Sequence, residues 1–356
     1  MKSPLTILLT GAGAPGTRGT LYALRAQAAA RVRVVGADLR AEVAGRLLCD
    51  RFSLLPPPED RSYLSQLIDL ARREHVDAIL PQTTREVAAL AGWRDTLASE
   101  GLPVVVSSPE SISLANDKHE VLKVFEALAL PYPRYRLCTS AHELRDCARE
   151  FGYPHRPVVV KPPVSNGMRG FRVLRADCWD AARFFAEKPS GVECSLDQLL
   201  AILATAETWP PLLVTEHLPG PEYSVDAFAG AKARIAIPRR RAEIRSGISF
   251  ATECERRPDL VETTLAAAER LGLRYAFGFQ FKLDAEGVPK VLECNPRVQG
   301  TMAASVFAGA NVIWMAVCEA LGAPQKLQTS ELRPYARFYR FWGGVGIGED
   351  GQTREI

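Results

Sequence analysis

The chain has 356 residues, of which 47% are hydrophobic and 24% are charged, as in ordinary globular proteins. This length accommodates two domains, and the composition excludes intrinsic disorder, collagen and a disulfide-stapled mini-scaffold. The 44 lysines and arginines against 41 aspartates and glutamates give a net charge of +3, which is too balanced to indicate nucleic acid as a partner.

The cysteines and histidines argue against a metal centre built from these side chains. The 8 cysteines form no C-x-x-C pair and have no histidine at zinc spacing, and the 5 histidines are scattered. Unpaired thiols are typical of a reducing compartment, so we expect a cytoplasmic protein.

No segment is predicted to cross a membrane. The apolar run Ile7–Leu9 is too short for a secretory signal. The segment 298–318 is uncharged over a membrane-spanning length, but it contains Gln299, Thr301 and Asn311. These polar side chains favour a buried helix over a transmembrane one.

Residues 1–110 alternate apolar strands with amphipathic helices. Strands are expected at 6–10, 32–38, 78–81 and 103–107, and helices at about 19–31, 62–75 and 86–100. This alternation predicts an α/β domain with a parallel, doubly wound sheet.

A second region, 111–342, is expected to be α+β. A helix is predicted at 116–128, and strands at 158–161, 171–174, 212–216, 222–228, 233–238, 278–284 and 289–295. The glycine-rich tail 343–356 has little apolar content and is expected to be flexible.

A glycine-rich turn follows the first strand. Gly11, Gly13 and Gly16 have the G-x-G-x-x-G spacing, and Asp38 ends the second strand. In dinucleotide-binding domains such glycines let the backbone approach a pyrophosphate, and the acid holds a ribose. The motif indicates an NAD-linked oxidoreductase, but any doubly wound domain favours glycine at its first tight turn, so a nucleotide-free scaffold is the alternative.

A second constellation lies on the hairpin formed by 278–284 and 289–295. Gln280 and Glu293 can share one face of this hairpin, with Asn295 two residues further along and Arg297 just beyond. Carboxylate and amide oxygens suit Mg²⁺, and an arginine here could neutralise a transferring phosphoryl group. The alternative is a hairpin whose polar end faces water.

Two further groups of residues have the chemistry of a nucleotide site. Lys161 ends an apolar strand directly before the glycine-containing loop 162–170, so it could bind phosphate or adenine. The strand 212–216 can offer backbone groups to an adenine edge, and Glu222 can accept hydrogen bonds from ribose hydroxyls. A solvated side chain is the alternative for each.

Taken in order, Lys118, Lys161, the glycine loop, the segment 216–222 and the Gln280/Glu293 hairpin resemble the ATP-grasp superfamily. The closest likeness is to its carbamoyl-phosphate-synthetase-like branch of single-module proteins, over about residues 1–325. The resemblance implies a Rossmann-like pre-ATP-grasp domain that binds no dinucleotide, followed by a two-subdomain ATP-grasp fold with a lid at about 120–215 and ATP between the subdomains.

The resemblance also implies a set of site residues. Contacts to the nucleotide are expected from Lys118, Lys161, Gly167, Arg169, Gly170, Glu216, His217, Leu218 and Glu222. One or two Mg²⁺ ions, with Mn²⁺ as an alternative, are expected on Gln280, Glu293 and Asn295.

The chemistry implied is phosphoryl transfer from ATP to a carboxylate, followed by attack of an amine on the acyl phosphate. Arg297 is expected to stabilise the pentacoordinate phosphoryl group. Arg239 and Arg245 lie in the basic segment 239–245 and are expected near the phosphates or the substrate carboxylate. A solvated basic loop or a nucleic-acid patch is the alternative for this segment.

Two observations favour a carboxylate–amine ligase over carbamoyl phosphate synthesis. The sequence after Arg297 lacks the second arginine found in carbamoyl-phosphate synthetases, and the chain holds one ATP-grasp module where those enzymes use two. A non-catalytic ATP sensor and the NAD-linked oxidoreductase are the rival functions; the intact metal set argues against the first.

The expected substrates are a small-molecule carboxylate and an amine, with amino acids or short peptides favoured by the resemblance. The acceptor pocket is expected near residues 82–86, where Thr83 and Arg85 could hold a carboxylate; helix capping is the alternative for Thr83. Nucleic acid and membrane are not expected as partners, and a homodimer is compatible with the resemblance.

Overall fold

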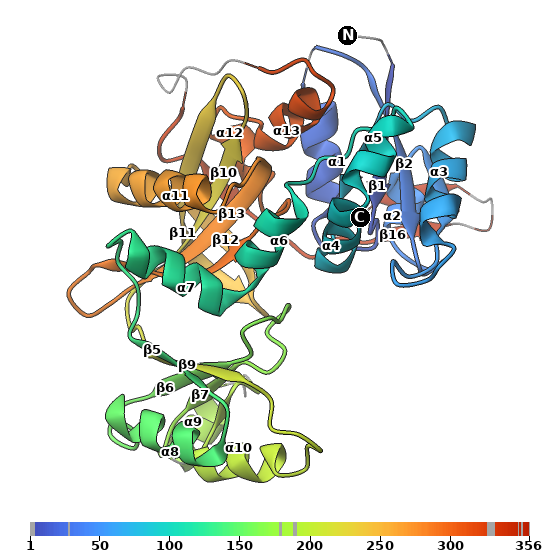
Figure 1. Cartoon of the computed structure of the whole chain (residues 1–356). Helices are drawn as coiled ribbons and strands as arrows, with labels where there is room; N and C mark the ends of the chain where they lie inside the picture. Colours follow the sequence, from blue (N-terminus) through green and yellow to red (C-terminus); the bar gives the residue numbers. More distant parts are fainter. Residues whose placement is uncertain are drawn as a thin grey trace. The chain divides into compact units, whose positions relative to one another are not determined.

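The computed structural model of the chain describes residues 4–27, 29–177, 180–187, 191–325, 332–347, 349 and 352–355 (Figure 1). The chain divides into two compact units. Unit 1 combines Met1–Ala115, Pro221–Phe281 and Glu293–Ile356, and unit 2 combines Asn116–Gly220 and Lys282–Leu292. Each unit is therefore built from segments that are distant in the sequence.

The N-terminal part of unit 1 is a four-stranded parallel sheet in the order β3-β2-β1-β4. Its strands are β1 (Leu5–Thr10), β2 (Val32–Asp38), β3 (Arg51–Leu54) and β4 (Ala78–Pro81). Every residue of β1 is buried, as expected for a central strand covered on both faces. The segment 103–107, predicted as a strand, contributes a single bridge between Val104 and Ile79.

Three helices connect these strands, and three more follow β4. They are α1 (Thr17–Arg25), α2 (Gly45–Leu48), α3 (Tyr63–Arg73), α4 (Thr84–Gly92), α5 (Arg94–Ser99) and α6 (Pro109–Asn116). In α3 the buried residues Tyr63, Leu67, Leu70 and Ala71 recur at helical spacing, so one face packs on the sheet. The helix predicted at 86–100 is divided at Trp93 into α4 and α5.

A six-stranded sheet in the order β14-β13-β10-β11-β12-β15 supplies the rest of the unit 1 framework, except that its segment Lys282–Leu292 is part of unit 2. Its strands are β10 (Glu222–Ala229), β11 (Arg234–Arg245), β12 (Ile248–Cys254), β13 (Tyr275–Leu283), β14 (Pro289–Asn295) and β15 (Arg337–Tyr339). The helices of this part are α11 (Pro258–Arg270), α12 (Ala304–Phe307) and α13 (Val312–Ala320).

The basic segment 239–245 is the second half of β11, so the alternative of a solvated loop is wrong. Antiparallel pairing with β12 places Glu253 opposite Arg240. Arg240 donates to Glu255 and forms ion pairs with both Glu253 and Glu255. Glu253 and Glu255 thus neutralise the charge of Arg240 within the sheet.

The two sheets of unit 1 share one hydrophobic core. Leu9 of β1, Leu24 of α1, Ile237 of β11 and Trp314 of α13 belong to a single buried cluster. Within it, the Asn311 amide donates to the Ala23 carbonyl oxygen at 2.6 Å. The uncharged segment 298–318 is therefore a packed part of this core, and no described helix is both long and apolar enough to span a bilayer.

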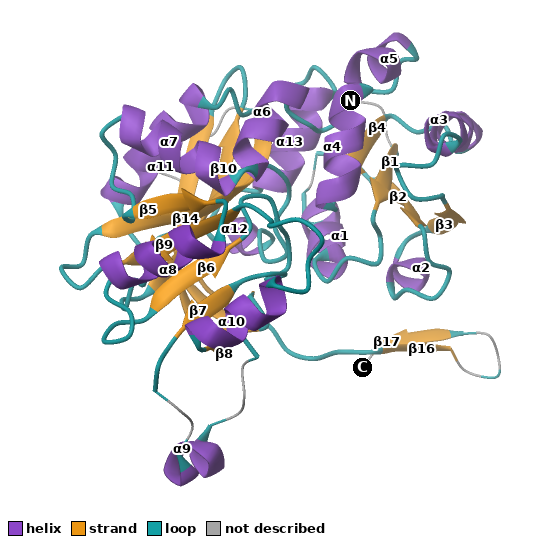
Figure 2. Cartoon of the chain, turned by 60° about the horizontal axis from the view of Figure 1, so that its bottom comes forward, coloured by secondary structure: helices purple, strands orange, loops and turns teal. Residues whose placement is uncertain are grey.

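Unit 2 contains a five-stranded sheet in the order β5-β9-β6-β7-β8. The strands are β5 (Tyr135–Cys138), β6 (Val158–Lys161), β7 (Arg172–Leu174), β8 (Glu193–Cys194) and β9 (Leu212–Glu216). The helices are α7 (Lys118–Ala127), α8 (Ala141–Glu150), α9 (Ala181–Ala186) and α10 (Leu196–Leu203). Helix α8 packs on β5 and β9 (Figure 2).

The C-terminal segment forms one antiparallel pair, β16 (Val345–Ile347) with β17 (Thr353–Glu355), visible as a separate ribbon in Figure 2. Several positions of the tail lie outside the described residues. The flexibility of 343–356 stays a prediction.

Candidate active site

The predicted metal ligands lie on neighbouring strands at one edge of the six-stranded sheet. Glu293 and Asn295 alternate along β14, so both side chains leave the strand on one face. The Asn295 amide donates to Glu293 Oε1 at 3.1 Å, and Gln280 lies on the adjacent strand β13. The sequence-predicted convergence of Glu293 with Asn295 is present in the structure.

This donor set fits Mg²⁺ rather than zinc. Among the described residues no three Asp, Glu, His or Cys side chains gather at one point, so a metal ion here would depend on the Glu293 carboxylate and amide oxygens. Mg²⁺ is commonly held by one or two protein carboxylates, with water and phosphate oxygens completing its octahedron.

Arg297 adjoins these ligands and is held in place by three contacts. Its Nη2 donates to Asn295 Oδ1 at 3.3 Å, its Nη1 to the Val298 carbonyl oxygen at 3.0 Å, and its Nε to Thr84 Oγ1 at 3.1 Å. Burial lowers the pKa of Arg297 while Glu293 opposes this shift, and an arginine so placed stays charged. The first turn of α4 therefore orients this guanidinium.

Arg241 is the arginine of β11 that faces the candidate site. It forms an ion pair with Glu222 and donates to Gln280 Oε1 at 3.4 Å. Ser249 Oγ and the Gly247 carbonyl oxygen accept its remaining hydrogen bonds at 2.8 and 2.6 Å. Sequence reasoning did not select Arg241. The signal that could have found it is the strand register, which pairs Tyr223 with Arg240 and so puts the next residue, Arg241, at the level of Glu222.

The structure does not bring Arg239 or Arg245 to this site. Arg239 has 0% exposure and donates to both oxygens of Asp226, at 2.6 and 2.8 Å. Arg245 is exposed, pairs with Glu243, and lies over the ring of Phe250 with its guanidinium carbon 4.6 Å from the ring centre. Arg239 is a buried partner of a carboxylate, and Arg245 lies at the surface end of β11.

The two lysines that the resemblance assigns to the nucleotide are both buried in unit 2. Lys118 Nζ donates to the Ser165 carbonyl oxygen at 2.9 Å, so the start of α7 is joined to the glycine loop. Lys161 Nζ donates to the Leu292 carbonyl oxygen at 3.0 Å. Asp117 caps α7 by accepting from the backbone N–H groups of His119 and Glu120, which fixes Lys118 at the first helical position.

The loop between β6 and β7 has the backbone of a tight turn. Gly167 and Gly170 have φ of +61° and +74°, a region that glycine adopts readily. A Cβ at Gly170 would lie 2.6 Å from Pro162 Cγ. Arg169 is exposed, and its Nη1 donates to the Asn166 carbonyl oxygen at 3.2 Å.

The segment after β9 is held by charged groups of unit 2. Glu216 accepts from Lys290 Nζ at 2.8 Å and from the Arg134 backbone at 3.0 Å. Burial opposes ionisation, but these contacts hold the pKa of Glu216 below its usual value. Burial, assisted by Lys282, lowers the pKa of His217. Leu218 is buried, so the side chains of this segment are largely structural.

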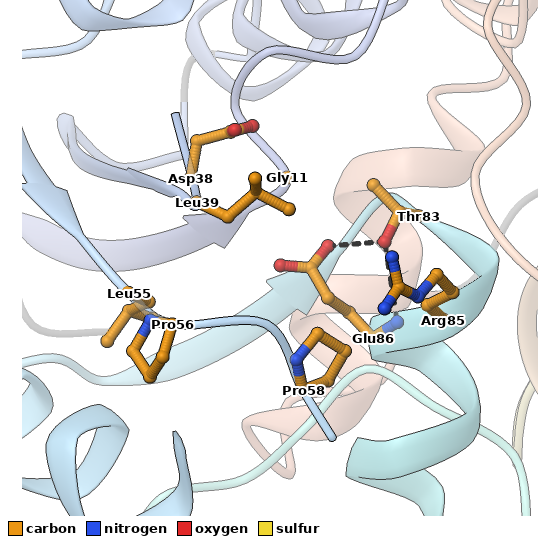
Figure 3. A pocket seen from close by; sticks show the side chains of 9 residues that line it. All are labelled: Gly11, Asp38, Leu39, Leu55, Pro56, Pro58, Thr83, Arg85 and Glu86. Atoms are coloured by element: carbon orange, nitrogen blue, oxygen red, sulfur yellow. Dashed lines mark hydrogen bonds between the residues drawn. The ribbon is translucent and has the colours of Figure 1, made fainter. Parts of the chain in front are cut away.

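The glycine turn of the N-terminal sheet is filled by the chain's own carboxylates (Figure 3). The Gly13 N–H donates to Asp38 Oδ2 at 2.7 Å. A Cβ at Gly11 would lie 2.6 Å from Glu86 Oε2. A dinucleotide pyrophosphate at this turn would therefore meet two carboxylates instead of free N–H groups, which opposes its binding.

The expected carboxylate contacts from Thr83 and Arg85 have other partners in the structure. Thr83 caps α4, accepting from the Glu86 N–H at 3.4 Å and donating to Glu86 Oε2 at 2.6 Å. Arg85 is paired with Glu59 through Nε at 2.8 Å and Nη2 at 2.5 Å. The capping interpretation of Thr83 is confirmed.

Comparisons with known proteins match two regions of the chain, one at the N-terminus and one in the C-terminal half. A family model described as "PylC-like, N-terminal domain" matches residues 7–105, and one described as "ATP-grasp in the biosynthetic pathway with Ter operon" matches residues 208–338. The carbamoyl phosphate synthase large chain of Clostridium acetobutylicum is 24% identical over 251 residues. That match covers 67% of this chain but only 21% of the relative, so this chain corresponds to a fraction of that protein.

Solved structures agree over nearly the whole chain. N5-carboxyaminoimidazole synthetase from Staphylococcus aureus, complexed with ADP, has a TM-score of 0.67 at 16% identity and covers 92% of this chain and 79% of its own. The biotin carboxylase domain dimer of Hydrogenobacter thermophilus 2-oxoglutarate carboxylase, complexed with MgADP, ADP and bicarbonate, has a TM-score of 0.70 at 16% identity, covering 95% and 74%.

The protein thus has a Rossmann-like N-terminal domain followed by an ATP-grasp fold. Residues 208–338 are similar to the ATP-grasp family model and residues 7–105 to the PylC-like one, and the solved structures share the fold over most of the chain. The resemblance and the fold class drawn from the sequence are confirmed. The oxidoreductase alternative finds no support in these comparisons.

Proposed function

We propose that this protein is an ATP-dependent, ADP-forming ligase that activates a carboxylate as an acyl phosphate for attack by an amine. The observation that carries the proposal is the cluster of Glu293, Asn295 and Arg297 at the end of β14, with Arg297 anchored through Thr84. A carboxylate, amide oxygens and an oriented guanidinium are the groups needed to hold metal-bound phosphates and their developing charge.

The resemblance and the chemistry of individual residues support the following contacts to the nucleotide. Lys118 and Lys161 are buried ammonium groups whose present partners include backbone carbonyl oxygens, and they would exchange these for phosphate and adenine. Gly167, Arg169 and Gly170 would lie over the triphosphate, and backbone groups of 216–218 would hold the adenine. Glu222, beside Arg241, would accept from the ribose.

Mg²⁺, held by Gln280, Glu293 and Asn295, would supply screening of the phosphate charges when bound. The substrate carboxylate attacks the γ-phosphorus of ATP, the bond to the β-phosphate oxygen breaks, and ADP leaves. An amine then attacks the acyl carbon, loses a proton, and displaces phosphate to form an amide. Arg297 stabilises the charge on the phosphoryl group in the first step, while exclusion of water protects the acyl phosphate.

A second candidate is phosphorylation of bicarbonate or carbamate. It is favoured by the match to a carbamoyl phosphate synthase chain and by the bicarbonate in a structural neighbour. The two candidates differ in the first acceptor: bicarbonate alone stimulates phosphate release in this second case, whereas an organic carboxylate is required in the first.

Calorimetric titration with Mg²⁺-ATP tests the proposal. We expect micromolar binding that needs Mg²⁺ and weakens in Glu293→Ala but not in Glu286→Ala, an exposed carboxylate of the β13–β14 turn. Phosphate release is then measured against amino acids, other carboxylates and bicarbonate. Binding of NAD(H) with no ATP signal would overturn the proposal.

We further propose a cytoplasmic location, a homodimeric assembly and amino-acid substrates. All the cysteines that the structure describes are free thiols, which supports a cytoplasmic protein. One structural neighbour was solved as a dimer. We propose that this protein also forms a homodimer, and sedimentation velocity tests this. Amino acids are the substrates to be screened first.

A further inference from the structure

A small pocket lies at the carboxyl ends of β1, β2 and β4 in the N-terminal domain. It is lined by Gly11, Asp38, Leu39, Leu55, Pro56, Pro58, Thr83, Arg85 and Glu86, and offers about 50 Å³ of free volume (Figure 3). The carboxyl ends of parallel strands are where open α/β sheets bind ligands. The volume exceeds that of one water molecule and is far below that of a nucleotide site.

The pocket contains two buried carboxylates. Asp38 is 7% exposed and Glu86 is 8% exposed. Asp38 accepts from the backbone N–H groups of Gly13 and Arg40, and the Arg40 guanidinium lies 3.8 Å away, largely in solvent. Glu86 accepts from Thr83 and makes no ion pair with a described residue. Burying carboxylates is costly unless a cation accompanies them.

Two buried hydroxyl groups lie behind the Glu86 carboxyl. Thr10 and Tyr63 lie beside the Glu86 carboxyl. Both hydroxyl oxygens are buried, and Thr10 favours the ionised form of the Glu86 carboxyl. Burial first, and the charge of Asp38 to a lesser degree, raise the pKa of Glu86. A donor entering the pocket would relieve this arrangement.

The one arginine in the lining is turned to another partner. The Arg85 guanidinium is engaged with both carboxylate oxygens of Glu59. The remaining walls are Leu39, Leu55, Pro56 and Pro58, which have no side-chain hydrogen-bonding groups. Such walls suit an alkyl chain and disfavour an inorganic cation, which needs six or more oxygen ligands.

The pocket adjoins the residue that orients Arg297. Thr83, in the pocket wall, is followed by Thr84, whose hydroxyl accepts from Arg297 Nε. Gly11 lies close to both Thr83 and Glu86, since a Cβ at Gly11 would meet both of these side chains. A substrate anchored in the pocket would therefore lie next to the helix turn that holds the proposed phosphoryl-stabilising group.

We propose that this pocket binds a protonated primary amino group on a short alkyl chain, held by Glu86 and Asp38, as the anchor of one of the ligase substrates. Identification of the bound molecule as a substrate rests on the proposed function; the affinity for an alkylammonium group does not. The pocket thus selects for a positive charge, the opposite of the carboxylate expected from Thr83 and Arg85.

Saturation-transfer NMR with propylammonium as the probe tests this inference. Propylammonium should bind saturably at pH 7.5, and propanol and propionate should not compete with it. Glu86→Gln should weaken binding about tenfold or more, because it removes a charge-assisted hydrogen bond, while Glu42→Gln, an exposed carboxylate after β2, should leave it unchanged. Leu39→Trp, at an exposed lining position, should block the pocket without touching either carboxylate.

Two further arms decide between outcomes. K⁺ and Mg²⁺ are tested as competitors; displacement of propylammonium by either at equal concentration would overturn the assignment to an organic ammonium. Equal binding of propylammonium by wild type, Glu86→Gln and Leu39→Trp would overturn the site itself. Mg²⁺-ATP titration of the same samples separates the two proposals: ATP binding without propylammonium binding rejects the pocket alone, and the reverse rejects the ligase.

Discussion

Unit 1 holds two carboxylate centres whose surroundings differ. At the end of β14, Glu293 lies among an amide and the guanidinium of Arg297, and Arg241 is nearby on the same sheet. Beyond the ends of β2 and β4, Asp38 and Glu86 lie among prolines and leucines. The first centre has protein cations available. At the second, Arg40 lies largely in solvent near Asp38, and Arg85 is paired with Glu59.

The difference indicates what each centre binds. A carboxylate supplied with guanidinium groups and amides can hold a metal ion and anionic phosphates together, because the protein balances both signs of charge. The negative charge of buried carboxylates that lack guanidinium and amide neighbours is neutralised only when the ligand brings positive charge. We expect variants of the two centres to separate nucleotide chemistry from substrate recognition.

The largest effect is expected at the first centre. Glu293→Ala should lower kcat for ATP-dependent phosphate release by about 10³-fold, because the metal loses its carboxylate ligand and the transferring phosphoryl group loses its screening. Steady-state phosphate release measures this, with Glu286→Ala as the control. If Glu293→Ala retained most of the wild-type rate, the assignment of β14 to the active site would be wrong.

A large effect on stability, rather than on activity, is expected within β10 and β11. Asp226→Asn should lower the free energy of unfolding by about 3 kcal/mol or more, because Arg239 would be left buried without its counter-charge. Urea denaturation followed by tryptophan fluorescence gives this number. Asp284→Asn, which removes a carboxylate near the end of β13 that pairs with Lys290, is the comparison and should cost less.

An intermediate effect should separate orientation of Arg297 from its charge. Thr84→Val removes the hydroxyl that accepts from Arg297 Nε, and we expect kcat to fall about tenfold with little change in KM for ATP. Thr96→Val, an exposed threonine of α5, should not alter kcat. A change confined to KM would mean that Thr84 acts on binding instead.

The smallest effect should appear as pH dependence at the second centre. The pKa of Glu86 is raised in the folded protein, so wild type should lose stability as pH rises from the usual glutamate range through that raised pKa. Glu86→Gln lacks this loss and should be more stable than wild type at pH 7. Thermal unfolding between pH 4 and 8 measures both; parallel curves for the two proteins would contradict the prediction. Saturating propylammonium should shift the wild type toward the variant.

The sequence predicted those parts of the site that follow from strand alternation and chain order. Glu293 and Asn295 could be placed together because residues two apart in a strand share a face. The contact of Lys118 with the glycine loop could not be derived locally, since it joins positions 47 residues apart. It entered only through the likeness to a known family.

The arginines of β11 show where sequence reasoning was incomplete. Arg239, Arg240 and Arg241 are indistinguishable in the sequence. In the structure Arg239 is fully buried, Arg240 pairs across the sheet surface, and Arg241 faces the candidate site. Which is which depends on the register between β10 and β11, which sets Arg239 opposite Ser224. Asp226, a carboxylate in an otherwise apolar stretch of strand, was the available sign that a buried arginine would accompany it.

The discontinuous make-up of unit 1 has a consequence for how the chain assembles during synthesis. Most of unit 2 comes from one continuous stretch, Asn116–Gly220, whereas unit 1 needs segments from both ends of the chain. The Ser107 hydroxyl bonds the Arg274 carbonyl oxygen, and Asn311 bonds Ala23. The N-terminal sheet is translated first but acquires these partners last, so its completion waits for the final third of the polypeptide.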